Sequence, residues 1–190
     1  MPNLSVERFA IPGPMLITPK RFGDERGIFS ETYSARAFAE IGIALTFVQD
    51  NYSSSLVPGT IRGLHFQIPP FAQDKLVRVS RGRVFDVAVD MRKDSTTFGR
   101  HIGVELTADS GSQLFVPVGF AHGLCTLEPN TEVVYKVSAF YAPECDKGIR
   151  WNDPALEISW PAFAGSQVSP KDAALPLLSQ IESPFICKGV

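Results

Sequence analysis

The chain has 190 residues, which fits one globular domain with a sizeable core. Apolar residues make up 44% and charged residues 20%, a balance that excludes an intrinsically disordered protein. The formal net charge of -2 and the absence of a long basic run exclude general attraction to nucleic acid or to an anionic membrane surface.

Most of the chain consists of short runs rich in Val, Ile, Phe and Thr, interrupted by Gly, Pro, Asp and Asn, which is typical of antiparallel β-structure. In chain order we predict strands over residues 15–19, 28–33, 47–53, 60–67, 75–80, 83–90, 101–106, 113–117 and 132–140. Pro117 and Gly119 also predict a turn that leads into a further strand with His122. So many strands with so few helices predict an all-β sandwich, jelly roll or closed barrel.

Two short helices are predicted. Ser34 can cap a helix over residues 35–41, and Gly42 tolerates a left-handed stop. A second helix is predicted near residues 172–180. The prolines after residue 150 argue against long elements there, so residues 150–190 are expected to be loops and short helices packed on the barrel of a single 1–190 domain.

The three cysteines are scattered and lack CxxC spacing, which indicates neither a disulfide framework nor a zinc site. The N-terminus has no basic segment followed by an apolar stretch, and no apolar run approaches the length of a membrane span. We therefore expect a soluble, cytoplasmic protein.

His65, in the run RGLHFQ, is a candidate for proton chemistry. In a regular strand it would face away from Arg62. An inward imidazole can be a hydrogen-bonded core histidine or a general base, because it titrates near neutral pH. Either role requires a partner that fixes the tautomer, and Asp172 and Asp86 are both candidates.

His122 lies in PVGFAHG, which resembles the second metal motif of the cupin superfamily, whose barrels often hold iron, manganese or zinc. A metal-binding cupin usually has two closely spaced histidines and a glutamate in its first motif, whereas here His65 is followed by Gln67. Three good ligands are not assembled, so no metal site is expected.

Four further side chains each have an ordinary and a functional interpretation. Alternation places Lys75 and Tyr135 on strand faces where they can point inward, although a surface lysine and a core tyrosine are the ordinary cases. Arg26 and Arg62 lie near glycines, and paired guanidinium groups either bind diphosphates or form structural ion pairs.

Segments spread along most of the chain carry a family resemblance. They are FGDERGIFSETY, FVQDNYS, residues 61–67, KLVRVSRGRVFDVAVDMR, FVPVGFAHG, VVYKVSAFYAPECDKGIRWNDP and PKDAALPLL. On these segments the chain resembles the dTDP-4-dehydrorhamnose 3,5-epimerase family. The resemblance implies an isomerase with a cupin-type jelly-roll β-barrel that uses no metal and no organic cofactor. It also implies a homodimer whose subunits exchange strands and complete each other's sites, so that Arg62 and His65 could serve different pockets.

The resemblance further implies a dTDP-4-keto-6-deoxyhexose substrate, with protons removed and returned on the opposite face at carbons 3 and 5. His65 would be the base, oriented by Asp172. Tyr135 would be the acid, and Lys75 would hold the oxyanion at carbon 4. The implied substrate-binding residues are Phe22, Arg26, Glu31, Gln49, Asn51, Arg62, His122 (paired with Asp86), Phe140 and Lys171.

Phe140 departs from the family pattern, in which a tyrosine or tryptophan often stacks near the nucleotide. Single-centre epimerases share most of these motifs, so the sequence leaves open whether one or both carbons are inverted, and Tyr135 favours both. Two other classes stay open as alternatives: a metal-dependent cupin and a non-catalytic jelly roll that binds a sugar or nucleotide.

Overall fold

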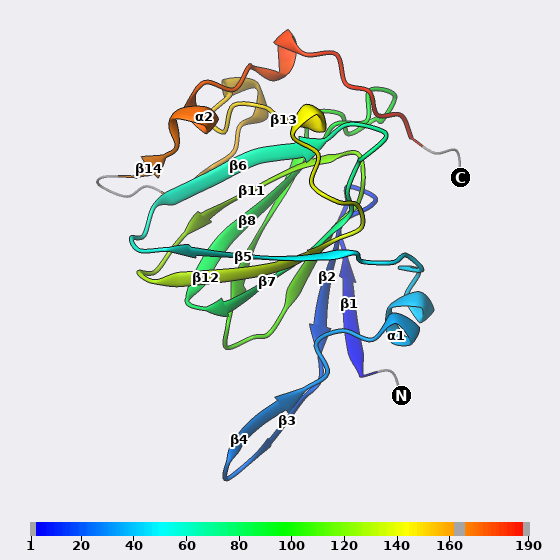
Figure 1. Cartoon of the computed structure of the whole chain (residues 1–190), viewed down its shortest axis with the longest axis vertical. Coiled ribbons are helices and arrows are strands. Elements are labelled where there is room, and N and C mark those ends of the chain that lie inside the picture. Colours follow the sequence, from blue (N-terminus) through cyan, green and yellow to red (C-terminus); the bar gives the residue numbers. More distant parts are fainter. Residues whose placement is uncertain (1–2, 162–165, 188–190) are drawn as a thin grey trace.

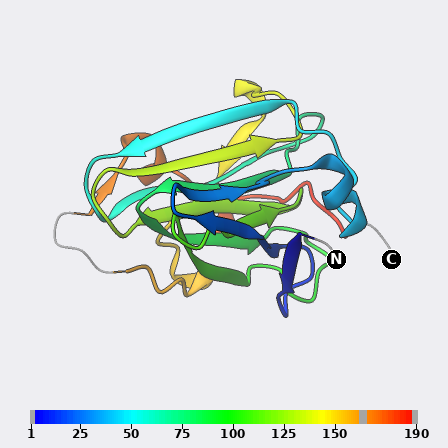
Figure 2. The same ribbon diagram turned by 90° about the horizontal axis from the view of Figure 1, so that it is seen from below.

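The computed structural model describes residues 3–161 and 166–187, which form two large sheets that pack face to face (Figure 1). The first sheet has the order β1 (Leu4–Arg8), β2 (Met15–Pro19), β10 (Gln113–Val116), β7 (Lys75–Arg81), β12 (Thr131–Val137) and β5 (Gln49–Ser55). The second has the order β13 (Asp146–Gly148), β6 (Thr60–Gln67), β11 (Phe120–Thr126), β8 (Arg83–Asp90) and β9 (His101–Thr107). All pairs along these two orders are antiparallel, and β5 and β12 lie side by side along one edge (Figure 2).

The main core lies between the sheets because alternate residues of each strand point inward. The first sheet contributes Val77, Val79, Leu114, Val116 and Val133, and the second contributes Val84, Ala88, Ile102, Leu106 and Leu124. This arrangement confirms the all-β jelly roll. Within the described residues, no strand pairing joins the two sheets, so they form an open sandwich rather than a closed barrel.

Part of the outer face of each sheet is also covered. Helix α1 (Ala35–Glu40) buries Phe38 against Met15 and Ile17 of β2. On the second sheet, Leu64 and Val87 pack under the C-terminal segments. Those segments contain η2 (Pro154–Leu156), β14 (Gln167–Val168), α2 (Pro170–Ala173) and η3 (Leu178–Gln180), while η1 (Pro143–Cys145) precedes β13.

Strands 15–19, 60–67 and 83–90 have the predicted bounds, and the other predicted strands differ at their ends. The strand predicted over 132–140 ends at Val137, because Ser138 turns aside to hydrogen-bond Asp74. The strand predicted over 28–33 ends at Ser30. Four strands were not predicted, β1, β3 (Arg21–Asp24), β13 and β14, because they are short or largely exposed and carry little apolar alternation.

The helix predictions need two corrections. Ser34 is the N-cap of α1, but its hydroxyl makes no cap bond, and only its carbonyl accepts from the Phe38 N–H. Gly42 does adopt a positive φ of 96° at the helix stop. The helix predicted near 172–180 is two separate turns, α2 and η3, because Pro176 lies between them and cannot continue a helix.

A hairpin of β3 and β4 (Gly27–Ser30) projects away from the body of the protein (Figure 1). Its apolar side chains are open to solvent, with Ile28 62% and Phe29 70% exposed. A two-stranded hairpin with no core of its own is marginally stable in water. This hairpin therefore lacks the packing that the rest of the fold has.

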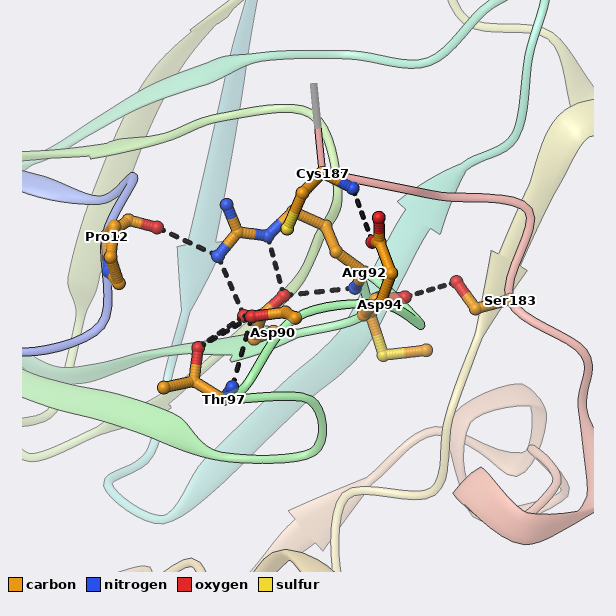
Figure 3. A network of polar contacts seen from close by, with 9 residues as sticks. Pro12, Asp90, Arg92, Asp94, Thr97, Ser183 and Cys187 are labelled. Atoms are coloured by element: carbon orange, nitrogen blue, oxygen red, sulfur yellow. Dashed lines mark hydrogen bonds and ion pairs between the residues drawn. The ribbon is translucent and has the colours of Figure 1, made fainter. Parts of the chain in front are cut away.

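A polar network ties the C-terminal tail and the N-terminal segment to the end of β8 (Figure 3). The fully buried Asp90 accepts hydrogen bonds from Arg92, Ser95 and Thr97. Arg92 also donates to the Pro12 carbonyl at 2.9 Å. Two tail contacts complete the network, Ser183 Oγ to the Met91 carbonyl and Cys187 N to Asp94 Oδ1.

Among the described residues, no helix has both the length and the apolar character that a membrane crossing requires.

Candidate active site

A cavity of about 520 Å³ lies between the two sheets. The first sheet lines it through β5, β7 and β12, and the second through β6 and β11. The peripheral segment from Gln167 to Asp172 closes one side. Six residues of the sequence analysis, including the four proposed as catalytic, line this cavity: Arg62, His65, Lys75, His122, Tyr135 and Asp172.

His65 and Asp172 form the first polar pair, with 2.8 Å between His65 Nε2 and Asp172 Oδ1. The second oxygen, Asp172 Oδ2, accepts from the backbone N–H of Gly63 at 3.1 Å. Burial lowers the pKa of His65, and the charge and hydrogen bond of Asp172 oppose this shift only in part. The imidazole is therefore neutral near pH 7. With Nε2–H donating to Asp172, Nδ1 carries the lone pair that can accept a proton.

Lys75 contributes a buried ammonium group to the same cavity. Its Nζ donates to the carbonyl of His65 at 3.3 Å. Desolvation lowers the pKa of Lys75 to about 8, against the attraction of Asp146 and Asp86. An ammonium has three donors, so Lys75 can donate to a ligand oxygen while it keeps this contact.

Tyr135 enters the cavity from the sheet opposite His65, since β12 belongs to the first sheet and β6 to the second. Burial raises the pKa of Tyr135, and the nearby charge of Arg62 reduces the shift. The phenol is therefore protonated at neutral pH and can serve as an acid. The imidazole and the phenol thus line one cavity from two different sheets.

His122 and Asp86 form a second buried pair, with 2.6 Å between Nε2 and Oδ1. His122 is the register partner of His65 on the neighbouring strand. Asp86 Oδ2 is buried and has no hydrogen-bond partner among the described residues. Spacing alone left Asp86 and Asp172 open as partners of His65, whereas the family resemblance implied the pairs His65–Asp172 and His122–Asp86. The structure contains both of these pairs.

Arg62 lines the same cavity as His65, so the alternation argument that separated them is wrong. Gly63 between them has a φ of 120°, and the pairing of β6 with β11 shifts register at this point. A Cβ on Gly63 would lie 2.6 Å from the Cα of Gly123, so only glycine fits here. This irregular backbone lets Arg62 and His65 point to the same side of the strand. A partner subunit is therefore not needed to explain why both can serve one pocket.

The guanidinium of Arg62 is held by the neighbouring strand. Its Nε donates to Ser55 Oγ at 3.2 Å and its Nη2 donates to the Ser54 carbonyl at 3.1 Å. These bonds fix the side chain at the wall of the cavity. A fixed guanidinium is well suited to bind an anionic group.

A second cavity of about 170 Å³ shares His65, Lys75 and Tyr135 with the first. Gln49 and Asn51 line it and hydrogen-bond each other at 2.8 Å. Lys171 reaches the same region, because its Nζ lies 2.6 Å from Asp146 Oδ2. These residues of the sequence analysis are therefore gathered around the three shared side chains.

Four residues of the sequence analysis lie apart from these two cavities. Phe22 and Arg26 are in the projecting hairpin, where Arg26 pairs with Asp24 and both residues line a shallow hollow. Glu31 follows the hairpin and is exposed. Phe140 is 61% exposed and lines neither cavity.

The aromatic side chain at the second cavity is Tyr141, which the sequence analysis missed. Its hydroxyl donates to Asp146 Oδ2 at 3.3 Å, and its N–H donates to Gln49 Oε1 at 3.2 Å. Asp146 was missed as well. Both follow the end of β12 at Val137, where strand alternation no longer predicts the direction of a side chain.

Within residues 3–161 and 166–187, no group of three His, Cys, Asp or Glu side chains could hold a metal ion. The two cavity histidines are each engaged with one carboxylate. This donor set does not fit the transition-metal site of a metal-dependent cupin.

Taken together, the fold and the cavity define an all-β protein that gathers an imidazole, a phenol and a buried lysine in one site, a set of groups suited to proton transfer. A family model described as dTDP-4-dehydrorhamnose 3,5-epimerase matches residues 8–180. The chain belongs to this family of isomerases.

Individual relatives agree with this assignment. The dTDP-4-dehydrorhamnose 3,5-epimerase of Salmonella typhimurium is 51% identical over 92% of this chain and 96% of its own length. A crystal structure of a Legionella pneumophila dTDP-6-deoxy-D-glucose-3,5-epimerase in complex with dTDP-4-keto-L-rhamnose has a TM-score of 0.92 and 42% identity, covering 98% of this chain and 99% of that one. The Bacillus anthracis dTDP-4-dehydrorhamnose 3,5-epimerase with TDP and PPi bound has a TM-score of 0.89 and 48% identity, covering 92% of this chain and 99% of that one.

Proposed function

We propose that the chain inverts carbons 3 and 5 of a dTDP-4-keto-6-deoxyhexose, using its own side chains and neither a metal nor an organic cofactor. The observation that carries the proposal is that His65 and Tyr135 line one cavity from opposite sheets. The Legionella pneumophila relative, described in complex with dTDP-4-keto-L-rhamnose, supports this class of substrate.

The chemistry begins at a C–H bond beside the 4-keto group. His65 accepts the proton, and the electron pair of the broken bond moves into the carbonyl to give an enolate with its charge on the oxygen of carbon 4. Tyr135 then donates its phenolic proton to the same carbon from the opposite face. Solvent returns a proton to Tyr135 and removes one from His65, so each turnover balances. A positioned base of this kind adds about a hundredfold to ten-thousandfold in rate.

The enolate is too basic to form in water at neutral pH, so its charge requires stabilisation as it develops. Lys75 is the proposed donor because its ammonium is buried and has hydrogens free for a ligand oxygen. Losing one such donor typically costs roughly 3 to 4 kcal/mol of transition-state stabilisation. His122, supported by Asp86, is the neighbouring polar contact.

Substrate binding is assigned to side chains around these groups. Arg62 and Arg26 bind the diphosphate, and Gln49, Asn51 and Lys171 contact the sugar and the nucleotide. Phe22, Glu31 and Phe140 complete the proposed set. Phe140 lies outside both cavities, whereas Tyr141 lines the second one. We therefore assign to Tyr141 the stacking role that the resemblance implied for Phe140.

The proposed assembly is a homodimer in which the β3–β4 hairpin of each subunit enters the site of the other. Two observations support it: the hairpin projects from the body, and its apolar residues Ile28 and Phe29 are uncovered. A second copy would bury them and bring Phe22 and Arg26 to the cavity. The proposed location is the cytoplasm.

Isotope exchange tests the proposal. Incubation with dTDP-4-keto-6-deoxyglucose in heavy water is expected to place deuterium at carbons 3 and 5, read by NMR. An intact substrate without exchange contradicts the proposal and favours a non-catalytic binding protein. Deuterium and inversion at one carbon only favour a single-centre epimerase. A stoichiometric transition metal whose removal abolishes exchange favours a metal-dependent cupin.

A further inference from the structure

Asp172 belongs to a peripheral segment with few attachments to the sheets. β14, which precedes it, pairs with only Thr60 and Ile61 of β6. Helix α2 has four residues, Pro170–Ala173, and a helix of this length is not stable in isolation. The position of the Asp172 side chain therefore depends on the local hydrogen bonds of its own turn.

Ser169 supplies one of these bonds. It is the N-cap of α2, and its Oγ accepts from the backbone N–H of Asp172 at 3.0 Å. The first helical residue, Pro170, has no N–H to offer. The turn also has backbone bonds, among them one from the Ala173 N–H to the Ser169 carbonyl at 2.9 Å. The cap hydroxyl adds a bond to the N–H of Asp172 itself, and this bond helps to set the direction in which the side chain of residue 172 leaves the backbone.

The carboxylate of Asp172 in turn fixes the position of the His65 imidazole. Its two oxygens engage His65 Nε2 at 2.8 Å and the Gly63 N–H at 3.1 Å, and the residue is 4% exposed. A carboxylate held at both oxygens cannot rotate without losing one bond. A shift of its backbone therefore breaks the contact with His65.

We propose that Ser169 is a positioning residue for the catalytic base: its hydroxyl holds the first turn of α2 in the geometry in which Asp172 orients the imidazole of His65. This inference rests on the proposed function, in which His65 removes the proton. Ser169 lines the first cavity, but in this role its hydroxyl acts through the backbone of Asp172 and needs no contact with the substrate.

Three substitutions test the role of the hydroxyl. Ser169→Ala removes it, while Ser169→Thr and Ser169→Val form an isosteric pair that differs in the hydroxyl alone. Ser110→Ala is the matched control, because Ser110 also accepts a backbone N–H, from Ser112, but lies in a turn that lines neither cavity. Melting temperatures establish that each variant is folded.

The decisive measurement is the titration of His65 by NMR in histidine-labelled, ligand-free protein. Asp172 raises the pKa of His65 against burial, and the charges of Lys75 and Asp146 also act on it. Ser169→Ala and Ser169→Val are expected to lower this pKa further and to reduce kcat by about three- to thirtyfold, the factor that a lost cap corresponds to. Ser169→Thr and Ser110→Ala are expected to leave both unchanged.

A double substitution separates positioning from other roles. In an Asp172→Asn background, removal of the Ser169 hydroxyl is expected to cause little further loss of kcat, because the path to His65 is already broken. An equal loss in both backgrounds overturns the proposal. A raised KM with an unchanged His65 titration also overturns it, since the hydroxyl would then contact the substrate. A wild-type protein without isotope exchange defeats the proposed function instead, while the titration still reports on Ser169.

Discussion

His65 Nε2 and Asp172 Oδ1 lie 2.8 Å apart although 107 positions of sequence separate the two residues. The contact joins a core strand to a four-residue helix on the periphery. It gives the imidazole a defined tautomer, with the lone pair on Nδ1.

Asp172→Asn is expected to lower kcat by about a hundredfold or more while the fold is retained. An amide can donate to Nε2, which would move the ring proton to Nδ1 and remove the acceptor that the reaction needs. The acid limb of the kcat/KM profile is also expected to shift to lower pH, because the carboxylate raises the pKa of His65. Initial-rate assays between about pH 5 and pH 9, in steps of about half a pH unit, would measure both effects. A wild-type rate contradicts the role of Asp172.

Lys75→Met is expected to reduce kcat by roughly two to three orders of magnitude, as for the loss of a donor to a developing oxyanion. The wild-type enzyme should lose activity as pH rises through about 8, since the ammonium then loses its proton. The residual activity of Lys75→Met should lack this basic limb. A basic limb that survives the substitution assigns it to another group.

Tyr135→Phe is expected to separate exchange from inversion. His65 can still remove a proton and exchange it with solvent, but no acid remains on the opposite face. The NMR spectrum in heavy water should show deuterium in unepimerised substrate, with inverted product lost. The phenol hydroxyl makes no hydrogen bond within the described residues, so stability should change by only about 0.5 kcal/mol. Normal yields of inverted product would contradict the assignment.

Asp90→Asn is expected to destabilise the protein by about 3 to 5 kcal/mol, because it leaves the charge of Arg92 without its buried partner. Burial raises the pKa of Asp90, but the hydrogen bonds from Arg92, Ser95 and Thr97 outweigh it and the net shift is downward. A lowered carboxyl pKa contributes stability that is present above the unfolded-state pKa and is lost as pH falls through the folded-state value. The variant should therefore lose less stability in acid than the wild type.

Urea unfolding at neutral and acidic pH would measure that difference. Asp50→Asn is the matched control, since Asp50 forms an exposed ion pair with Lys136. Such a pair contributes about 0 to 1 kcal/mol. Equal losses of unfolding free energy in the two variants would show that the network around Asp90 stabilises the protein no more than an exposed ion pair does.

Subunit complementation tests the proposed exchange of the hairpin. Arg26→Ala and His65→Asn are each expected to be nearly inactive. If the hairpin serves the partner's site, a mixed dimer contains one site with both residues intact. Unfolding and refolding the two variants together should then restore about a quarter of wild-type activity, the share expected for random pairing. A mixture as inactive as its components places Arg26 in the site of its own subunit or outside any site.

Local sequence determined the type of most elements and the identity of the central groups. Alternation of apolar residues predicted β6, β7, β8 and β12, and family motifs singled out His65, Lys75, Tyr135 and Asp172, all of which line one cavity. This succeeded because strand formation and the chemistry of a side chain depend on short segments of chain.

Only the tertiary structure decided how these groups meet. It brought Arg62 to the face of His65 through the irregular backbone at Gly63 and placed Tyr141 rather than Phe140 beside the second cavity. It also supplied the geometry of the pairs His65–Asp172 and His122–Asp86, which the family resemblance had implied and strand spacing had left open. Alternation holds only while a strand stays regular, and it carries no information once a glycine with positive φ or the end of a strand interrupts it. Contacts between residues far apart in sequence arise from the packing of whole sheets, which no local pattern records.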